Sequence, residues 1–521
     1  MYKGKRVQKE YEKRIKLFDK TQKKAFSYLD KNDEQAAVFF QITCHLAHKN
    51  NFGLYYSHEI ENALQEISLS HVTCRDLPPS DRIRNVLHIA TEINTIGGHN
   101  RILQNWFSYS NILKNDLVIT NQTQNCTSKE LIYFFNKLGA KLYFLKNDKK
   151  DILSRAKMLY NIATNYDAIV LHIHHYDVIP SIALSKFKRP IMLLNHADHS
   201  FWVGRNITNL ILEIRETGKT LSKQKRNIPE TNQYILPIPL QKKETIKKHE
   251  ARQILKINQD DIIVFSVAST HKYIPIEGRG INELFLSLSN RYDNIKIIVV
   301  GPDKSTKFWQ DLYINSNYKV NAIGGKNNIC LYYIASDFYV DSYPISSLTS
   351  LLDAAKYRVP IFSINNNNDP YSIDDIALNN IKFKFSSFHE LEERIAHLIS
   401  NKKEYLAYSE QCYSSISKYH LEDGWIIFLN EAYRKAIKLP KIHSISTNKT
   451  QYFFDDYEVN SIRINQNDAF TDYYNIIKKH WLSLSVKNKT DFFITITLYV
   501  IVRPKFFLSS LLRLYFKRKV R

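Results

Sequence analysis

Residues 338–364 have the sequence FYVDSYPISSLTSLLDAAKYRVPIFSI, and this stretch indicates the fold. Its apolar start, Phe338–Asp341, predicts a buried strand that ends in a polar loop around Pro344. Ser347–Tyr357 then predicts a helix, and Pro360–Ser363 a second strand. A strand, a crossover helix and another strand make a parallel βαβ unit, so the chain is predicted to be an α/β protein.

The same alternation recurs in two blocks on both sides of a proline-containing connector, Leu236–Leu240. The other predicted strands are Asn85–Ala90, Asp116–Thr120, Lys141–Leu145, Ala168–Ile173 and Pro190–Leu194, with Ile211–Gly218 as the last strand and turn of the first block, and Asp261–Ser266 and Ile295–Val300 in the second. We therefore predict two Rossmann-like, doubly wound domains that face a cleft. Open sheets of this kind bind ligands at the carboxyl ends of their strands.

The domain organisation is predicted from the length of the chain and from the proline-containing breaks in its sequence. A chain of 521 residues is too long for one core. We predict a helical N-terminal extension over 1–80, a first Rossmann-like domain over 81–238, a second Rossmann-like domain over 239–440 and a C-terminal extension over 441–521. The Pro78-Pro79 pair marks the first boundary.

The start of the Ser347–Tyr357 helix carries groups that suit a diphosphate. A helix N-terminus offers unpaired N–H groups and a partial positive charge. Thr349 and Ser350 add hydroxyl donors, and Asp353, about one turn further on, can accept from ribose hydroxyls. The alternative is purely structural: Ser346, Ser347 and Thr349 would only cap the helix, and Asp353 would favour its dipole.

The order Asp-x-x-Pro, polar loop, Thr-Ser, two apolar residues, Asp-Ala and Val-Pro resembles the donor-nucleotide motif of GT-B glycosyltransferases. It is most similar to the motif of O-linked N-acetylglucosamine transferase-like enzymes and of bacterial surface-polysaccharide transferases. The resemblance implies that the domain over 81–238 binds the acceptor and that the domain over 239–440 binds a nucleotide sugar. It implies that Thr349, Ser350 and the helix start hold the diphosphate of that sugar, and that Asp353 holds its ribose. It also implies a charge-neutralising role for Lys272, just before Pro275, although a loop lysine is typically solvated surface. Arg279 is a second candidate cation.

The chain departs from the family pattern in the same loop. The common retaining transferases have two glutamates flanking a glycine-rich turn, whereas this chain has Ile345 and Asp353 at those places. Ser346-Ser347-Leu348 replaces the usual glycines. A catalytically inactive GT-B-like scaffold therefore stays open as an alternative, as does a nucleotide-sugar epimerase or a polyol-phosphate transferase.

A glycine pair follows the first strand of the first block. Gly97 and Gly98 permit close backbone approach at a strand-to-helix turn, and His99 follows them. The spacing is not GxGxxG, which disfavours a tightly bound dinucleotide. The loop resembles the Gly-Gly-His loop of many GT-B transferases, which faces the donor sugar and the acceptor. His99 is a candidate general base or acceptor contact, because imidazole titrates near neutral pH.

Further histidines follow two other strands of the first block. The candidates for contact with sugar hydroxyls are His174, His175 and His196, and His172 is predicted to be a hydrogen-bonded interior residue. With Asp177 or Asp198 these histidines could instead ligate a metal, but their order matches neither HxHxDH nor HExxH. We predict no metal and no other cofactor.

The formal net charge of +22 points to an anionic partner. No nucleic-acid-binding motif is present, so we predict no nucleic acid. The C-terminal stretch contains no acidic residue, and seven basic residues alternate there with apolar ones: Arg503, Lys505, Arg513, Lys517, Arg518, Lys519 and Arg521. This pattern predicts that residues about 490–521 bind an anionic membrane surface, the alternative being a C-terminal helix docked on the body.

Cysteine usage and the N-terminus indicate the compartment. The five cysteines are widely spaced without a CxxC pair, and no signal peptide is visible. We therefore predict a cytoplasmic protein, peripheral on the inner face of the cell membrane. Its predicted activity is transfer of a hexose or N-acetylhexosamine from a nucleotide-diphosphate sugar to a glycan, a lipid-linked saccharide or a protein, in cell-surface polysaccharide or glycoconjugate synthesis.

Overall fold

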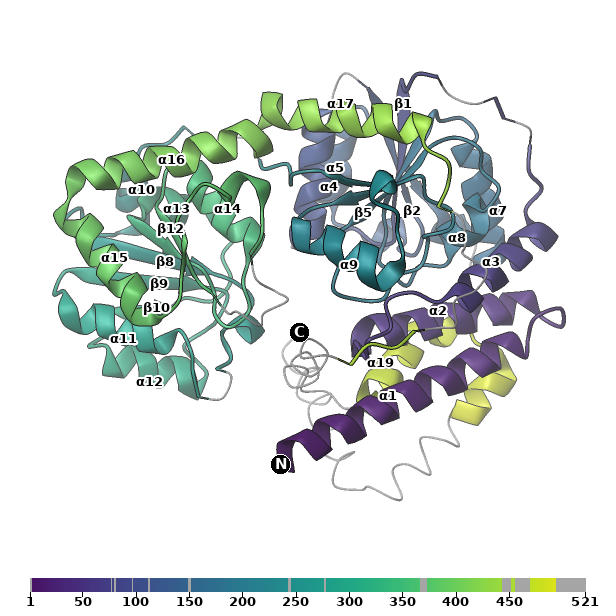
Figure 1. Ribbon diagram of the computed structural model, residues 1–521, viewed down its shortest axis with the longest axis horizontal. Helices are drawn as coiled ribbons and strands as arrows, with labels where there is room; N and C mark the ends of the chain where they lie inside the picture. The colour runs from purple at the N-terminus through teal and green to yellow at the C-terminus, as the bar shows by residue number, and fades with distance from the viewer. Residues whose placement is uncertain are drawn as a thin grey trace.

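The computed structural model describes residues 2–492 except 76, 79, 80, 96, 111, 112, 149, 150, 242–244, 276, 277, 366–372, 443–450 and 455–468. Two parallel β-sheets form its centre, one in each half of the molecule (Figure 1). The predicted basic tail therefore lies outside the described residues, apart from its first few.

The first sheet has seven strands in the order β3-β2-β1-β4-β5-β6-β7, all paired in parallel. They are β1 (Asn85–Ala90), β2 (Lys114–Ile119), β3 (Leu142–Phe144), β4 (Ala168–His172), β5 (Ile191–Asn195), β6 (Leu210–Glu213) and β7 (Gln233–Ile235). The connecting elements are α4 (Gly98–Tyr109), η1 (Gln124–Cys126), α5 (Lys129–Lys137), α6 (Leu145–Asp148), α7 (Ile152–Ala163), α8 (Ile179–Leu184), α9 (Glu216–Arg226) and η2 (Glu230–Asn232). The central strands are continuous buried runs, because helices cover both faces.

The second sheet has six strands in the order β10-β9-β8-β11-β12-β13, again all parallel. They are β8 (Ile262–Val267), β9 (Ile295–Val300), β10 (Val320–Ala322), β11 (Phe338–Val340), β12 (Ile361–Ile364) and β13 (Lys384–Phe385). The elements around it are α10 (Lys248–Leu255), η3 (Thr270–Tyr273), α11 (Asn282–Arg291), α12 (Lys307–Asn315), α13 (Cys330–Ala335), α14 (Leu348–Lys356), η4 (Ile376–Leu378) and α15 (Phe388–Ser400).

Two doubly wound parallel sheets were predicted, and this fold class is confirmed. Each predicted strand overlaps an observed one. The prediction that Ile211–Gly218 ends the first sheet is wrong, because β7 follows it. The sequence also did not indicate β10 or β13. These edge strands have only two or three residues, too few for an apolar run to stand out.

In both sheets the strand order reverses direction next to the first strand. The switch lies between β1 and β4 in the first sheet and between β8 and β11 in the second. The segments that leave the carboxyl ends of these strands diverge to opposite sides, which opens a crevice for a ligand.

Helices from both ends of the chain pack together beside the first sheet. They are α1 (Tyr2–Phe26), α2 (Asp33–Asn50), α3 (His58–His71) and α19 (Ala469–His480), the last continuing into η5 (Trp481–Ser483). Figure 1 shows α19 side by side with α1 and α2, although more than 400 residues of sequence separate it from them. Most of α2 is buried, including Phe40 and Ile42, because it packs against α1 and α19 and against α7 of the first half.

Two long helices join the halves at the top of the view in Figure 1. α16 (Lys402–His420) covers the second sheet, and α17 (Glu422–Lys438) extends over the first. Trp425 is fully buried there, and its indole N–H donates to the carbonyl oxygen of Pro237 at 2.6 Å. Its ring also meets Trp106 of α4 edge-on, at 5.3 Å between centroids. The chain thus returns to the first half after completing the second.

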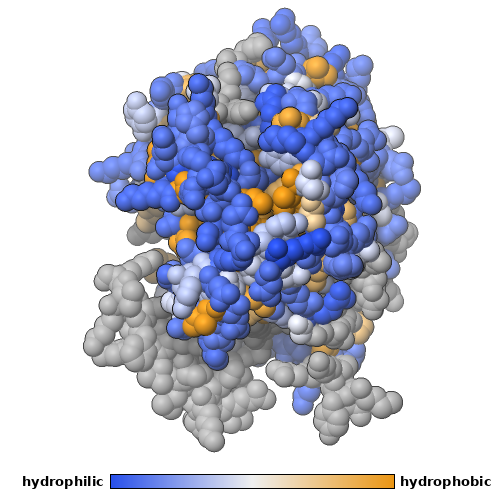
Figure 2. Space-filling view, turned by 90° about the vertical axis from the view of Figure 1, so that its left-hand side faces the viewer, coloured by the Kyte–Doolittle hydropathy of each residue, from blue (hydrophilic) through white to orange (hydrophobic). Residues whose placement is uncertain are grey.

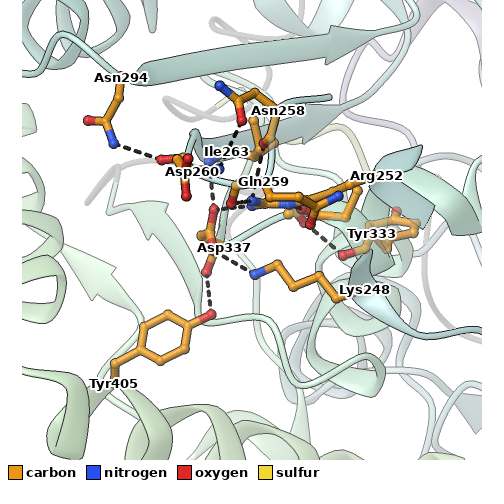
Figure 3. A network of polar contacts seen from close by, with 12 residues as sticks. Lys248, Arg252, Asn258, Gln259, Asp260, Ile263, Asn294, Tyr333, Asp337 and Tyr405 are labelled. Carbon is orange, nitrogen blue, oxygen red and sulfur yellow. Dashed lines mark hydrogen bonds and ion pairs between the residues drawn. The ribbon is translucent and has the colours of Figure 1, made fainter. Parts of the chain in front are cut away.

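A partly buried ion cluster holds α10 against the second sheet (Figure 3). The Asp337 carboxylate forms ion pairs with Lys248 Nζ at 2.5 Å and with Arg252 Nη2 at 2.7 Å, and both cations belong to α10. It also accepts the backbone N–H of Ile263 at 2.7 Å. Tyr405 of α16 donates to the carbonyl oxygen of the same aspartate. One residue therefore links α10, β8, β11 and α16.

We expect Asp337→Ala to lower the free energy of unfolding by about 3 kcal/mol, because it leaves the buried Arg252 guanidinium without its counter-charge. The measurement is urea unfolding followed by circular dichroism. Asp311→Ala is the matched control, since Asp311 forms an exposed pair with Lys307 on α12 that is worth about 0.5 kcal/mol at most. Equal midpoints for the two variants would contradict the assigned role.

The face on the side of the second sheet is mostly hydrophilic, with small apolar areas (Figure 2). None of the described helices combines the length and the hydrophobicity that crossing a lipid bilayer requires.

Candidate active site between the two sheets

The switch point of the second sheet places Lys272 beside the start of α14. Lys272 lies in η3, directly after β8, and its Nζ donates to the carbonyl oxygen of Ser346 at 2.7 Å. Asp341 follows β11, and both of its carboxylate oxygens accept the N–H of Ser347, at 3.0 and 3.1 Å. These contacts hold the loop before α14 and keep an ammonium group at the N-terminus of that helix.

The electrostatics of this loop favour an anion. Burial raises the pKa of Asp341 to about 7, against the opposing effect of the Lys272 charge. Burial also lowers the pKa of Lys272, and Asp341 partly offsets this. Near neutral pH Asp341 is thus only partly ionised, so it does not fully neutralise the cation beside it. The positive potentials of the Lys272 ammonium and of the α14 N-terminus therefore add at the start of this helix.

The hydroxyl groups of α14 do not cap the helix in the usual way. Ser347 occupies the N-cap position, yet its side chain makes no capping hydrogen bond to the backbone. Its Oγ instead lies 3.0 Å from Oγ of Ser350. The Ser347 side chain therefore contributes no capping bond to the backbone, which the structural interpretation assigned to it together with Ser346 and Thr349.

The Asp353 carboxylate is shared between two cations. Oδ1 accepts from Lys356 Nζ at 3.0 Å, and Oδ2 lies 3.3 Å from Nη1 of Arg101. Arg101 belongs to α4 of the first half, so this ion pair crosses between the halves. Asp353 is nearly buried, with 8% of its surface exposed.

The glycine loop of the first half faces α14 at the same place. Gly97 is the N-cap of α4 and has a φ of +125°, a conformation that favours glycine. At Gly98 a Cβ atom would lie 3.5 Å from the Cγ2 of Thr349. The structure therefore brings together two predicted segments, 97–99 and 347–353, that the sequence indicated independently.

The predicted histidines of the first half form one cluster at the carboxyl ends of β1, β4 and β5. His99 stacks on His196, with ring centroids 3.9 Å apart and planes at 17°. His175 lies 4.5 Å from His196, and His174 lies 6.3 Å from His99. His172 is fully buried and bonds His88 at 2.9 Å, so it is an interior residue, as predicted.

Burial and mutual repulsion keep these rings uncharged at neutral pH. Desolvation, followed by neighbouring histidines, lowers the pKa of His99 well below its usual range. The same causes lower the pKa of His196 to about 3. Nε2 of His99 and both ring nitrogens of His175 are buried without a partner among the described residues. Neutral imidazoles with unpaired nitrogens can hydrogen-bond a hydroxyl-rich ligand.

Arg279 is exposed, and no contact joins it to the other predicted donor residues in the part of the chain that the structure describes. Within the same part, no group of three or more His, Cys, Asp or Glu side chains is placed to hold a metal ion.

Sequence reasoning missed the side chains that the terminal helices bring to the cluster. His48 of α2 stacks over His175 at 5.8 Å. Lys479 of α19 pairs with Glu92 at 2.9 Å and donates to the hydroxyl of Tyr176 at 2.8 Å. The Tyr176 hydroxyl in turn lies 3.1 Å from Nδ1 of His174. No local spacing signals these contacts, since α19 lies almost 400 residues after the β1 loop.

No protein-family model and no curated protein sequence matches this chain. Solved structures do. A glycosyltransferase from Rickettsia africae superposes with a TM-score of 0.53 at 12% identity, covering 68% of this chain and 99% of that one. HepE from Anabaena, solved in complex with UDP, superposes with a TM-score of 0.51 at 11% identity, covering 68% of this chain and all of that one. The chain has the GT-B fold.

The GT-B assignment explains why the two switch points face each other. Gly98 lies close to Thr349 and Arg101 pairs with Asp353, so the loop after β1 meets the start of α14. About a third of this chain lies outside the match to each of these structures, which cover only 68% of it.

Proposed function

We propose that this protein is a glycosyltransferase that uses a nucleotide-diphosphate sugar. The observation that carries the proposal is the convergence at one switch point of the Lys272 ammonium, the start of α14 and the glycine loop of the opposite half. HepE, which shares the fold, has been solved with UDP and with UDP-glucose. An anionic diphosphate is the ligand class that this convergence of positive potential suits.

In the proposed mechanism, Lys272 and α14 stabilise the charge that develops on the departing nucleoside diphosphate. The backbone N–H groups of the first turn of α14 and the hydroxyls of Thr349 and Ser350 would hold the phosphates, and no metal is needed for this. His99, or one of the other cleft histidines (His174, His175 and His196), would orient or deprotonate the acceptor hydroxyl. If the configuration is retained, an oxygen of the donor phosphate can take the proton instead.

We further propose the biological setting that the sequence indicates. The acceptor is a glycan, a lipid-linked saccharide or a protein, and the sugar is a hexose or an N-acetylhexosamine. The protein would work in cell-surface polysaccharide or glycoconjugate synthesis, in the cytoplasm and peripheral on the membrane. The acid-free basic stretch of residues 492–521 supports the membrane part.

A binding screen across UDP, GDP, ADP, CDP and dTDP by calorimetry tests the donor assignment, and a labelled sugar nucleotide with the selected base then tests the reaction. Transfer of label to an acceptor supports the proposal. Donor binding with unchanged label would indicate a scaffold. Recovery of an isomeric sugar would indicate an epimerase, and transfer of a polyol phosphate a phosphotransferase. Absence of binding to every nucleotide would overturn the proposal.

We expect Asp353→Asn to be partly tolerated and Asp353→Ala to weaken nucleoside-diphosphate binding about tenfold to a hundredfold, because a carboxylate bonded to ribose hydroxyls is a charge-assisted acceptor. The decisive measurement compares the ribonucleotide with its 2′-deoxy analogue. Wild type should bind the deoxy form more weakly, whereas Asp353→Ala should bind both nearly equally.

The ion pair with Arg101 provides the matched control, since Arg101→Ala removes this one contact between the halves but keeps the carboxylate. This variant should still discriminate against the deoxy nucleotide. If Arg101→Ala loses the discrimination as fully as Asp353→Ala does, Asp353 acts by joining the two halves and not by holding ribose.

A further inference from the structure

The segment that follows α19 is short and firmly held against α2. Gln35 of α2 makes three hydrogen bonds to it. Its Nε2 donates to the carbonyl oxygen of Ser483 at 3.0 Å. Its Oε1 accepts from the N–H of Ser485 at 3.0 Å and from Nδ2 of Asn488 at 2.9 Å. The orientation of the side chains along this segment is therefore set by α2.

This held segment turns two large apolar side chains outward. Leu482 is 90% exposed and Val486 is 80% exposed, the two highest values among the large hydrophobic residues that the structure describes. Between and after them, Leu484 and Phe492 are buried. Single exposed apolar residues are common, but here two occur four positions apart on a scaffold that prevents them from folding inward.

The surroundings of these two side chains are basic. Residues 473–490 contain four lysines and no acidic residue: Lys478, Lys479, Lys487 and Lys489. Lys478 and Lys487 are exposed. After Asp491 the sequence continues to residue 521 with seven further cations and no acid. The apolar pair thus lies at the start of the most strongly cationic part of the chain.

We propose that Leu482 and Val486 dock on an anionic lipid surface, and that the exposed Lys478 and Lys487 contact its headgroups. Apolar side chains flanked by cations suit the boundary between headgroups and acyl chains, where the two contributions add. A protein partner needs about 1,000 Å² of complementary surface, more than two side chains supply. The inference rests on the membrane part of the proposed function and is independent of sugar transfer.

The test uses the full chain and vesicles of phosphatidylcholine and phosphatidylglycerol at 3:1. We expect Leu482→Ser/Val486→Ser to weaken vesicle binding about tenfold, because two apolar groups no longer leave water. Tyr133→Ser/Ile427→Ser is the matched control: these residues are 69% and 65% exposed on α5 and α17, and their loss should change binding less than twofold. Tryptophan emission of Leu482→Trp should shift to the blue with these vesicles, and that of Ile427→Trp should not.

Three results would overturn the inference. In the first, Leu482→Ser/Val486→Ser binds vesicles as tightly as wild type, whereas Arg513→Gln/Lys517→Gln/Arg518→Gln/Lys519→Gln does not bind them. Membrane attachment would then depend on the tail alone. Another is unchanged emission of Leu482→Trp on vesicles that bind the protein. In the third, analytical ultracentrifugation shows that Leu482→Ser/Val486→Ser changes the oligomeric state while vesicle binding stays unchanged. Leu482 and Val486 would then belong to a contact between proteins.

Discussion

Replacing Lys272 by methionine is expected to lower turnover by about a hundredfold to a thousandfold, the scale on which a preorganised charge at the reacting centre contributes. The ammonium lies at the start of α14, where a departing diphosphate gains negative charge, and burial around it strengthens its field. The measurement is the rate of nucleoside-diphosphate release from the donor that the binding screen selects.

Two comparisons separate this effect from a loss of folding. Lys307→Met removes the same charge from an exposed site on α12 of the same half and should keep turnover within about twofold of wild type. Lys272→Met also removes the hydrogen bond to Ser346, so its thermal unfolding is measured in parallel. Turnover within threefold of wild type in a folded Lys272→Met protein would assign Lys272 to the loop structure alone.

His99→Ala is expected to lower turnover by about two orders of magnitude or more, while donor binding barely changes, because acid–base groups contribute on this scale. Its ring is uncharged at neutral pH and lies against the other cleft histidines, beside the glycine loop that faces α14. Saturating donor and varied acceptor are used, so that the turnover and the acceptor KM are measured separately.

His99→Gln distinguishes chemistry from positioning. Glutamine keeps hydrogen-bonding capacity but cannot take a proton at neutral pH, so a base role predicts the same loss as in His99→Ala. His249→Ala, on the exposed face of α10, controls for removal of a histidine. Collapse of donor affinity with surviving turnover at saturation would make His99 a binding residue and place the base elsewhere.

The sequence alone was sufficient for the fold class and for the local segments of the site. Continuous apolar runs alternating with helices dictate parallel strands, because only a sheet covered on both faces buries such runs. Since the carboxyl ends of parallel strands share one edge, Lys272 after β8, Ser347 before α14 and His99 after β1 could be assigned to sheet edges without any structure. Short edge strands such as β13 carry too few residues for this reasoning.

Only the tertiary structure decided which of these segments meet and what else joins them. The pairing of Arg101 with Asp353 depends on how the two halves of the molecule pack on each other, which no local pattern encodes. The same holds for Lys479, which reaches Glu92 because α19 packs on α2 beside the first sheet. Local propensity acts over one or two turns of chain, whereas such contacts arise when buried faces of distant elements are matched by shape and charge. Their residues become neighbours only after the core has formed.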